Sequence, residues 1–500
     1  NFPPVNSQTV TSFAADSDGS PWRIAGAGFD TRVTSMGWQS ADDTDFDGQP
    51  DTNANLHDNR ETPNFYKDSD GLDDDYRIRL TVLSNQAQSE CISGASPECG
   101  VLGVLNNDTL FESNFDSPGS GLVNVQYNEV GIIDLQAQLV DINEAATPYL
   151  GTDVIIGRVR NLGRFYPQRF DPSAVSLLPR VTASCSPPSS FTYMDEPFGI
   201  AATLTARNLQ GNTTVNYRGG FAKLDLYNEL NLRAIEVVDP GDNNNLSSRL
   251  LNTSSPNGIP ADLEPEWSSV NGGVLLIDGN LVYARANPAN PDGPYEYLVI
   301  AFDPTDNDGV TLDVSVLNAE ITESLPEFFE LARHDFRYGR IQIDNAYGPE
   351  TEPLDITFRV EYFDGTQFVT NTDDACTLIQ SNNLDLLSGT YTGALDEFET
   401  DIVPAQSSTF NAGLIQGTQA ASNPTDLTFT ATAPGEDNAG TVDIELDLSP
   451  SGLNLPWLQF KWPHDDQDFN ENPRATLEFG QFRSHDRVIN WQEIYNGATP

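Results

Sequence analysis

Apolar and polar side chains alternate in short runs throughout this chain of 500 residues. In 354–362 every second residue is apolar and the residues between are Asp, Thr, Arg and Glu; 78–82 and 442–448 follow the same period. A period of two places one face of a β-strand in a core and the other in water, as in antiparallel sheets. Because 38 Gly and 33 Pro residues interrupt these runs, the sequence predicts an all-β fold. We expect tandem antiparallel, Ig-like β-sandwich domains with long acidic loops and little helix.

One stretch favours a helix instead. The apolar residues of 325–331 are preceded by Ser324, which can cap a helix, and Pro326 lies where the first turn would begin. We therefore expect one short helix at 325–331.

The length of the chain predicts several domains, because single cores seldom organise more than about 250–300 residues. We expect an acidic N-terminal region with calcium loops at 1–80 and β-sandwiches at 81–172, 173–380 and 381–500. No apolar run of about 18 residues occurs, so no membrane insertion is expected. The first residues lack the basic start and apolar core of a secretory signal, so we expect a removed signal or a fragment of a longer protein.

The charge of the chain excludes two classes of partner. It carries 25 Lys and Arg residues against 74 Asp and Glu residues, a net charge of −49. Such a chain repels nucleic acid phosphates and anionic lipid headgroups across a Debye length of about 8 Å, so neither is an expected partner. The same charge strains a compact state, and bound divalent cations would relieve that strain.

An acidic stretch near the N-terminus has the spacing of a calcium loop. Carboxylates at relative positions one, three, five and nine, with a glycine at position six, come from Asp43, Asp45, Asp47, Asp51 and Gly48. Alternate residues point inward, and the glycine permits the sharp turn that a cage of oxygen ligands needs. Position twelve is Ala54 rather than the Glu of an EF-hand, so the pattern favours an extended loop like those of thrombospondin repeats.

A second acidic stretch lies close by and could share or double the same site through Asp68, Asp70, Asp73 and Asp74. We expect Ca²⁺ to bind these two stretches as the cofactor of the chain. The alternative is that their Asp-Gly pairs form turns on a solvated acidic surface. Two further stretches are weaker: 303–309 follows an apolar run and is expected to be a turn, and 464–470 is either a cation site or a polar loop.

The four cysteines favour oxidation in pairs. Cys91 and Cys99 flank a segment whose Gly and Pro could return the chain, so a small disulfide loop is expected. Cys185 and Cys376 remain; their bond would close a loop of roughly two hundred residues and stabilise the fold by on the order of 5 kcal/mol. No Cys-x-x-Cys motif or Cys/His cluster suggests zinc. Disulfides indicate an exported protein, whereas four reduced cysteines would indicate a cytosolic one.

Catalytic motifs are absent from the sequence. The histidines stand apart and belong to no zincin, nucleophile-elbow or cysteine-protease pattern: His57, His334, His464 and His485. In so acidic a chain, pairs of carboxylates are too numerous to indicate a glycosidase. We therefore expect a protein that is not an enzyme. Trp457, Trp462 and Trp491 could stack on sugar rings, as in carbohydrate-binding modules, or could pack in cores.

Short motifs in a fixed order connect the sequence with a known family. They are 163–170 (GRFYPQRF), 191–198 (FTYMDEPF), 205–208 (TARN), 214–217 (TVNY), 293–295 (GPY), 303–309 (DPTDNDG), 337–340 (RYGR), 345–348 (NAYG), 368–377 (FVTNTDDACT) and the closing run 455–495. These motifs resemble those of MshQ-type proteins, which are encoded with mannose-sensitive haemagglutinin (MSHA) type IV pili. The resemblance covers about residues 124–495. The family's Trp-x-Gly-Asp-Gly loop is replaced here by 462–466 (WPHDD).

The resemblance implies an exported protein, outside the cell or at its surface, that is associated with an MSHA-like pilus as a candidate tip or accessory adhesin. It implies no catalytic residues. Its partners would be pilus components or further copies of the chain, and a surface glycan or a host or abiotic surface. Two other functions stay open: a calcium-dependent carbohydrate-binding module protein, and a subunit of a self-assembling extracellular filament. In each of them, disulfides and calcium would stiffen tandem sandwiches.

Overall fold

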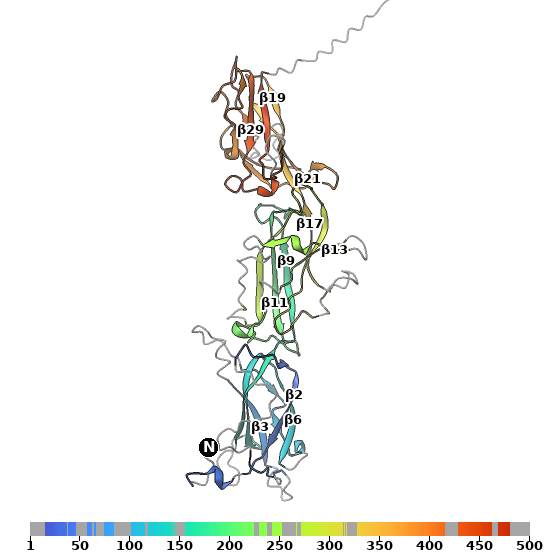
Figure 1. The fold of residues 1–500 in the computed structure, drawn as a ribbon, viewed down its shortest axis with the longest axis vertical. Helices are drawn as coiled ribbons and strands as arrows, with labels where there is room; N and C mark the ends of the chain where they lie inside the picture. Colours follow the sequence, from blue (N-terminus) through green and yellow to red (C-terminus); the bar gives the residue numbers. More distant parts are fainter. Residues whose placement is uncertain are drawn as a thin grey trace, which may run out of the picture.

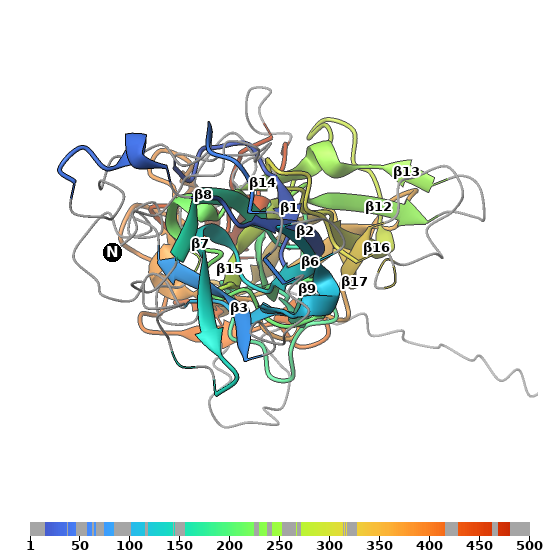
Figure 2. The same ribbon diagram turned by 90° about the horizontal axis from the view of Figure 1, so that it is seen from below.

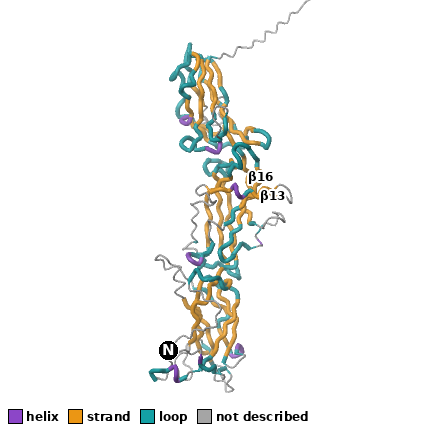
Figure 3. The backbone as a smooth tube through the Cα atoms, viewed as in Figure 1, coloured by secondary structure: helices purple, strands orange, loops and turns teal. Residues whose placement is uncertain are grey.

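The computed structural model describes residues 16–37, 39–46, 58–62, 65–66, 75–84, 102–115, 119–143, 145, 156–224, 230–237, 243–252, 267, 272–313, 315, 317, 328–415, 429–462 and 469–480. These residues form strands and short 3-10 turns, and no α-helix occurs among them. Figure 1 shows three bodies that follow one another along the long axis in the order of the sequence, and Figure 3 shows that strands dominate each. In Figure 2, seen along that axis, the bodies lie over one another, so the molecule is a rod. The predicted all-β fold of tandem sandwiches is confirmed.

The first sandwich packs two sheets face to face around one core. One sheet has the order β1 (Arg23–Ile24), β8 (Ile156–Tyr166), β7 (Gly131–Asp141), β3 (Tyr76–Ser84), β5 (Thr109–Leu110). The other has the order β2 (Gly28–Thr34), β6 (Ser120–Tyr127), β4 (Leu105–Asn106). The alternation predicted for β3 is confirmed, because Ile78, Leu80 and Val82 are buried between the two sheets.

The second sandwich has the same plan. One sheet has the order β10 (Phe191–Tyr193), β17 (Phe329–Arg337), β16 (Tyr295–Phe302), β12 (Arg233–Val237), β13 (Asn243–Asn245). The other has the order β14 (Leu250–Asn252), β15 (Val274–Tyr283), β11 (Pro197–Arg207), β9 (Arg169–Leu178). The inner faces of both sheets meet in one core, to which Phe198, Leu281 and Ile300 belong.

The third sandwich is built from shorter strands. Two of its sheets have the orders β18 (Gly339–Ile343), β21 (Phe358–Phe363), β22 (Phe368–Thr370), with β27 (Leu414–Ile415) beside β21, and β19 (Ala346–Gly348), β30 (Arg474–Phe479), β29 (Gly440–Leu446), β24 (Leu384–Leu386), with β25 (Thr392–Gly393) beside β29. Two strand pairs complete it: β20 (Leu354–Ile356) with β28 (Phe429–Ala431), and β23 (Leu378–Gln380) with β26 (Ser407–Thr409). Its core includes Ile356, Val442 and Leu477.

Helical structure in the described residues is limited to short 3-10 turns such as Pro456–Leu458. None of these turns is long or apolar enough to cross a membrane. The helix predicted at 325–331 is wrong for the part that is described, because Phe329 begins strand β17. The ring of Phe329 lies 5.5 Å from that of Phe302 on the paired strand β16, and this packing outweighs a local capping signal. Residues 325–327 lie outside the described residues.

Very short connections join the three sandwiches. Only Pro167 and Gln168 separate β8 from β9, and only Tyr338 separates β17 from β18. Neighbouring sandwiches also share side chains, since residues beside or within strands of one sandwich lie in the core of the next: Val130 and Ile132 in the second core, Phe191 and Tyr193 in the third. We call the contact between the first and second sandwiches the first joint, and that between the second and third the second joint. The domain limits expected at residues 80, 172 and 380 stay predictions, and β3 runs through the first of them.

Candidate functional site at the interdomain joints

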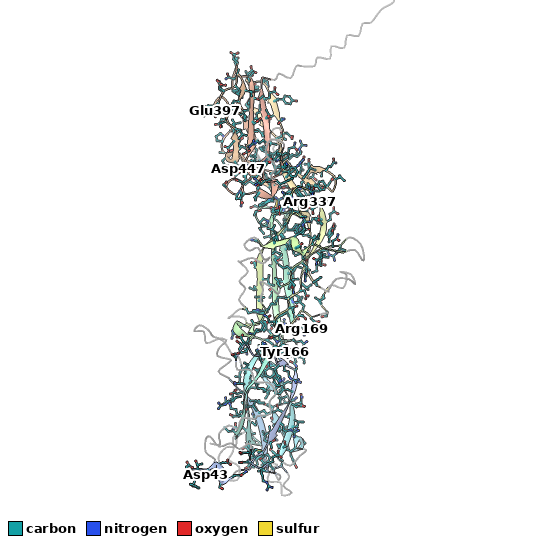
Figure 4. All side chains as sticks on the ribbon, viewed as in Figure 1. Asp43, Tyr166, Arg169, Arg337, Glu397 and Asp447 are labelled. Atoms are coloured by element: carbon teal, nitrogen blue, oxygen red, sulfur yellow. A yellow bond between two sulfur atoms is a disulfide. The ribbon has the colours of Figure 1, made fainter. Side chains whose placement is uncertain are left out.

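Of the expected calcium ligands, only Asp43 and Asp45 lie in the described residues. Asp43 is buried and Asp45 is exposed, and Figure 4 places Asp43 at the end of the rod that is distant from both joints. In the described parts of the chain, no three His, Cys, Asp or Glu side chains are grouped so as to hold a metal ion. The other expected ligands lie outside those parts: Asp47, Asp51, Asp68, Asp70, Asp73 and Asp74. Calcium therefore stays a prediction.

The other candidates from the sequence are packed or lie outside the described residues. The stretch 303–309 is a turn as predicted, because the Gly309 N–H donates to the Asp306 carbonyl oxygen at 2.9 Å. Trp457 is 4 % exposed in the third core, so its ring is not available to a sugar. Trp462 is half-buried, with its ring 5.7 Å from that of Phe460. Outside the described residues lie Trp491, Cys91, Cys99 and 463–468.

A buried ion pair closes the first joint. Arg164 near the end of β8 and Asp308 in the 303–309 turn have side chains that are 3 % and 4 % exposed. The guanidinium donates two hydrogen bonds to the carboxylate, one of them at 2.5 Å, and its Nε donates to the Gly19 carbonyl oxygen at 2.7 Å. The pair links two sandwiches across 144 positions of sequence. Removing either partner would leave the other charge buried and unpaired, which costs about 3–5 kcal/mol.

A second carboxylate ties the same two sandwiches together through backbone groups. Glu129, between β6 and β7, is 5 % exposed and accepts a hydrogen bond from the Val130 N–H at 2.8 Å. Across the joint it accepts from the N–H groups of Val215 and Asn216, each at 3.1 Å. The Asn216 side chain in turn donates to the Val130 carbonyl oxygen at 3.2 Å. Burial raises the pKa of Glu129 to about 7, although the three N–H donors oppose this rise. The first joint thus contains a carboxyl group that titrates near neutral pH.

A cluster of buried charged and polar groups fills the second joint. Arg180, which follows β9, donates from Nε to both carboxylate oxygens of Glu196, at 3.1 and 3.0 Å, and from Nη2 to Thr377 Oγ1 at 2.5 Å. Its Nη1 lies 3.3 Å from Asp374, and the three charged side chains are fully buried. Arg180 and Glu196 belong to the second sandwich, whereas Asp374 and Thr377 belong to the third. The cluster therefore spans the joint.

Arg180 and hydrogen bonds keep Asp374, one of the two acidic members of this cluster, ionised. Asp374 accepts from the Tyr193 hydroxyl at 2.8 Å and from Thr377 Oγ1 at 2.6 Å. Burial opposes the ionisation of Asp374. The charge of Arg180 and the hydrogen bonds from Thr377 and the Cys376 N–H outweigh burial and hold the pKa of Asp374 below its usual value. Burial raises the pKa of Glu196, and the guanidinium of Arg180 opposes that rise. Asp374 is thus the carboxylate that faces Arg180 from the third sandwich as a charge.

The disulfide between Cys185 and Cys376 spans the same joint. Their Cα atoms lie 5.0 Å apart although the residues are 191 positions apart in sequence. The bond joins the loop after β9 to the loop after β22, and Arg180 Nη1 donates to the Cys376 sulfur at 3.4 Å. Closing so long a loop stabilises the fold by on the order of 5 kcal/mol in the chain-entropy account.

Two further arginines secure the outer parts of the second joint. Arg337 at the end of β17, labelled in Figure 4, pairs with Asp373 at 2.7 Å and donates to Asn371 Oδ1 at 2.5 Å. Arg285, which follows β15, reaches towards the third sandwich through backbone oxygens and a ring: the carbonyls of Gly339 and Trp457 and the ring of Tyr338. Bending at this joint would break these contacts as well as those of the buried cluster.

The histidine of the second sandwich is buried in a polar pair. His334 is the one histidine in the described part of the chain, and its Nε2 lies 2.8 Å from Thr192 Oγ1. Burial lowers the pKa of His334 to about 4, so its ring is neutral at physiological pH. His334 is 7 % exposed and Thr192 is 0 % exposed, so the pair is closed to a substrate.

Apart from the pairing of Cys185 with Cys376, sequence reasoning did not identify the joint residues as partners. Most of them lie within the motifs found in the sequence: Arg164, Asp308, Glu196, Asp374 and Thr377. Those motifs mark the joints without saying which residues meet, because partners are as far apart as the 197 positions between Arg180 and Thr377. Arg180 itself lies outside every motif, so no signal pointed to it.

Three models of one family match consecutive parts of the chain. The model described as DUF6701, second domain, matches residues 3–121, that of the third domain residues 129–332, and that of the fourth domain residues 337–494. Together the matches span nearly the whole chain. The third-domain match begins at Glu129 and ends within β17, beside the two joints. No curated protein sequence matches the chain.

Several solved structures match the chain at low TM-scores. The Escherichia coli adhesin FdeC is 9 % identical, with a TM-score of 0.27 over 87 % of this chain and 94 % of that one. Zebrafish RET cadherin-like domains 1 to 4 are 9 % identical, with a TM-score of 0.24 over 81 % of this chain and 66 % of that one. A tandem from titin is 5 % identical, with a TM-score of 0.19 over 91 % of this chain and 94 % of that one. TM-scores this low carry no argument about fold or function, so the fold assignment rests on the strands and cores described above.

Proposed function

Because this chain belongs to the DUF6701 family and carries the second, third and fourth of its domains in tandem, we propose that it is an exported, non-enzymatic surface protein. Its proposed role is that of a stiff stalk or accessory adhesin of an MSHA-like type IV pilus, the system suggested by its MshQ-type motifs. One observation carries this proposal: a disulfide and a buried ion cluster lock the second and third sandwiches together at one joint.

The disulfide supports export. Cys185 and Cys376 are half-buried, so reductants of the cytosol could reach the bond. Structural disulfides persist mainly in oxidising compartments such as the periplasm and the cell exterior, and they are rare in the cytosol of mesophiles. A bond that holds a joint closed is therefore best suited to a protein that works outside the cytoplasm.

The joints support a role as a stalk. Connections of one or two residues leave little chain to act as a hinge. Bending the first joint would separate Arg164 from Asp308 and Glu129 from its backbone donors in the second sandwich. Bending would also expose the apolar side chains that the two sandwiches share, Val130 and Ile132, so the straight arrangement is favoured. A rod of this kind holds its far end at a fixed distance from its attachment, as a filament tip or adhesin must.

Calcium remains part of the proposal at the end of the rod. We place it at the N-terminal acidic stretches, where Asp43 marks the outer end of the first sandwich (Figure 4). Both joints are already closed by arginine–carboxylate pairs and a disulfide, so the proposed ion would stiffen the outer loops rather than the joints.

The test is the accessibility of the native protein on intact cells. A chain with a C-terminal epitope tag is followed by adding protease to intact cells, with pilus assembly either permitted or blocked. We expect the protease to remove the tagged chain from intact cells, and blocked assembly to reduce the amount at the surface. A chain that is protected until the cells are broken, with free thiols at Cys185 and Cys376, would contradict export. If the chain is exposed at the surface whether or not the pilus assembles, export stands and only the link to the pilus is contradicted.

A further inference from the structure

The position of the disulfide along the chain determines how the rod responds to tension. We propose that the Cys185–Cys376 bond carries tension past most of the second sandwich, so that pulling on the two ends of the rod cannot unravel residues 186–375. The second sandwich apart from β9, and strands β18 to β22 of the third, would then be shielded from load, while the first sandwich and the rest of the third bear it.

The path of tension follows from the order of the elements. Force that enters through the first sandwich runs along β8 and β9 and reaches Cys185 seven positions after the end of β9. It crosses to Cys376 through the sulfur bridge and leaves towards β23, which begins two positions later. Every strand from β10 to β22 lies between the two cysteines, in a closed loop beside this path.

Within the second sandwich, only β9 lies on the path. It is the last strand of its sheet and pairs with β11 along its length, from Arg169 opposite Arg207 to Leu178 opposite Gly199. Figure 1 shows both strands aligned with the long axis of the rod. Separating β9 from β11 would release only the residues of β9. It would leave β11 paired with β15, and β16 paired with β17. Most of the second core therefore stays closed under load.

The buried cluster holds the two ends of this bypass together. Arg180 lies on the tensioned segment between β9 and Cys185, and it binds Thr377 directly beside Cys376. Asp374, two positions before Cys376, faces the same guanidinium at 3.3 Å. Covalent and ionic contacts thus join the same two short segments, so the load passes from the second sandwich to the third at one point.

The hidden length is large enough to measure. With 191 positions between the cysteines, the bypassed loop has the length of nearly two hundred residues. An extended residue spans about 3.4 Å, so the loop hides roughly 650 Å of contour length. A chain with the bond intact should lack this length however completely it unfolds.

Single-molecule pulling on the purified full-length chain tests the proposal. Handles are fused to both ends, and a background with Cys91→Ser and Cys99→Ser leaves one cysteine pair. We expect complete unfolding under oxidising conditions to release roughly 650 Å less than in the presence of a phosphine reductant. The variant that also carries Cys185→Ser should release the longer length under both conditions, which makes it the matched control.

Each outcome of this experiment is decisive. Equal contour lengths with and without reductant would overturn the proposal, as would two free thiols in the oxidised sample. If Cys185→Ser does not fold, adding reductant to the folded chain that retains both cysteines still supplies the comparison. The purified chain reports on the bypass alone, so the proposal of export to the cell surface stands or falls separately, on the protease experiment.

Discussion

Asp308→Ala is expected to open the first joint. The change removes the carboxylate that pairs with Arg164, whose guanidinium keeps the hydrogen bond to the Gly19 carbonyl oxygen. The backbone N–H of residue 308 still donates to Asp306, so the turn itself retains its internal bond. The substitution therefore perturbs the ion pair with little direct effect on the fold around it.

The magnitude follows from burial. The Arg164 side chain is 3 % exposed, so its charge cannot be hydrated in place, and an orphaned buried charge costs about 3–5 kcal/mol. Whole domains are stable by about 5–15 kcal/mol, so this loss is a large fraction of the total. Replacing both partners with apolar residues, in Arg164→Met with Asp308→Leu, removes the charge together with its partner and should recover most of the loss.

Hydrogen exchange reports the opening locally. The Leu209 N–H of the second sandwich donates to the Ala25 carbonyl oxygen of the first at 2.9 Å, so the peptide that contains Leu209 reads the state of the joint. We expect Asp308→Ala to accelerate its exchange by at least about a hundredfold, since 1.4 kcal/mol corresponds to a factor of ten. The matched control is Glu330→Ala, which removes the exposed pair with Arg333 and should cost less than about 1 kcal/mol.

Two results would refute this reasoning. If Asp308→Ala and Glu330→Ala change exchange at Leu209 equally, the buried pair does not hold the joint. If the doubly apolar variant is damaged as much as Asp308→Ala, the loss comes from packing or from the turn rather than from an orphaned charge.

Four further outcomes concern pH, sulfur and metal. Burial raises the pKa of Glu129 from 4.5 to about 7, so its contribution to stability is full below pH 4.5 and is lost as pH rises through 7. Glu129→Gln should abolish that loss of about 3 kcal/mol. Burial lowers the pKa of His334 from 6.5 to about 4, so its contribution is full above pH 6.5 and is lost as pH falls through 4. His334→Gln should abolish this second loss, also about 3 kcal/mol. Urea unfolding at several pH values checks both: the two slopes oppose each other between about pH 4.5 and 6.5, and curves parallel to the wild type would contradict the assignment. Cys185→Ser, in the background without Cys91 and Cys99, should lower the free energy of unfolding by on the order of 5 kcal/mol, and an unchanged urea midpoint would contradict that. A calcium chelator should lower the melting temperature if the N-terminal acidic stretches bind Ca²⁺ in the folded state, whereas an unchanged melting curve would remove the metal from the proposal.

The residues with which each strand faces a core could be predicted from the sequence, because local strand geometry determines them. Leu354, Ile356, Phe358 and Val360 are all at most 5 % exposed, as their alternation with polar residues predicts. The pleat of a strand alone decides which face a residue lies on, so no distant partner has to be known. In the described part of 325–331 the expected helix was wrong for the opposite reason, because contact with another strand decides the conformation of Phe329.

The joints could not be predicted in the same way. Choosing the partner of Arg164 among 74 acidic residues requires the register of β8 and the position of a turn 144 residues away. The charge of a residue says that it needs a partner when buried, but neither its type nor its spacing says which one. The cysteines were an easier case, since only four are present and two of them lie close together in sequence.

The few basic residues explain how so acidic a chain keeps three bodies in line. With 74 acidic and 25 basic residues, facing surfaces of neighbouring sandwiches would repel each other most strongly where contact excludes water. Arg164 and Arg180 lie at those two contacts, 2 % and 1 % exposed, and each faces a carboxylate of the neighbouring sandwich. Dissolved salt screens exposed charges beyond about 8 Å but affects buried pairs much less. The joints are therefore closed by ion pairs that dissolved salt screens only weakly. The acidic surface around the joints makes separate rods repel one another.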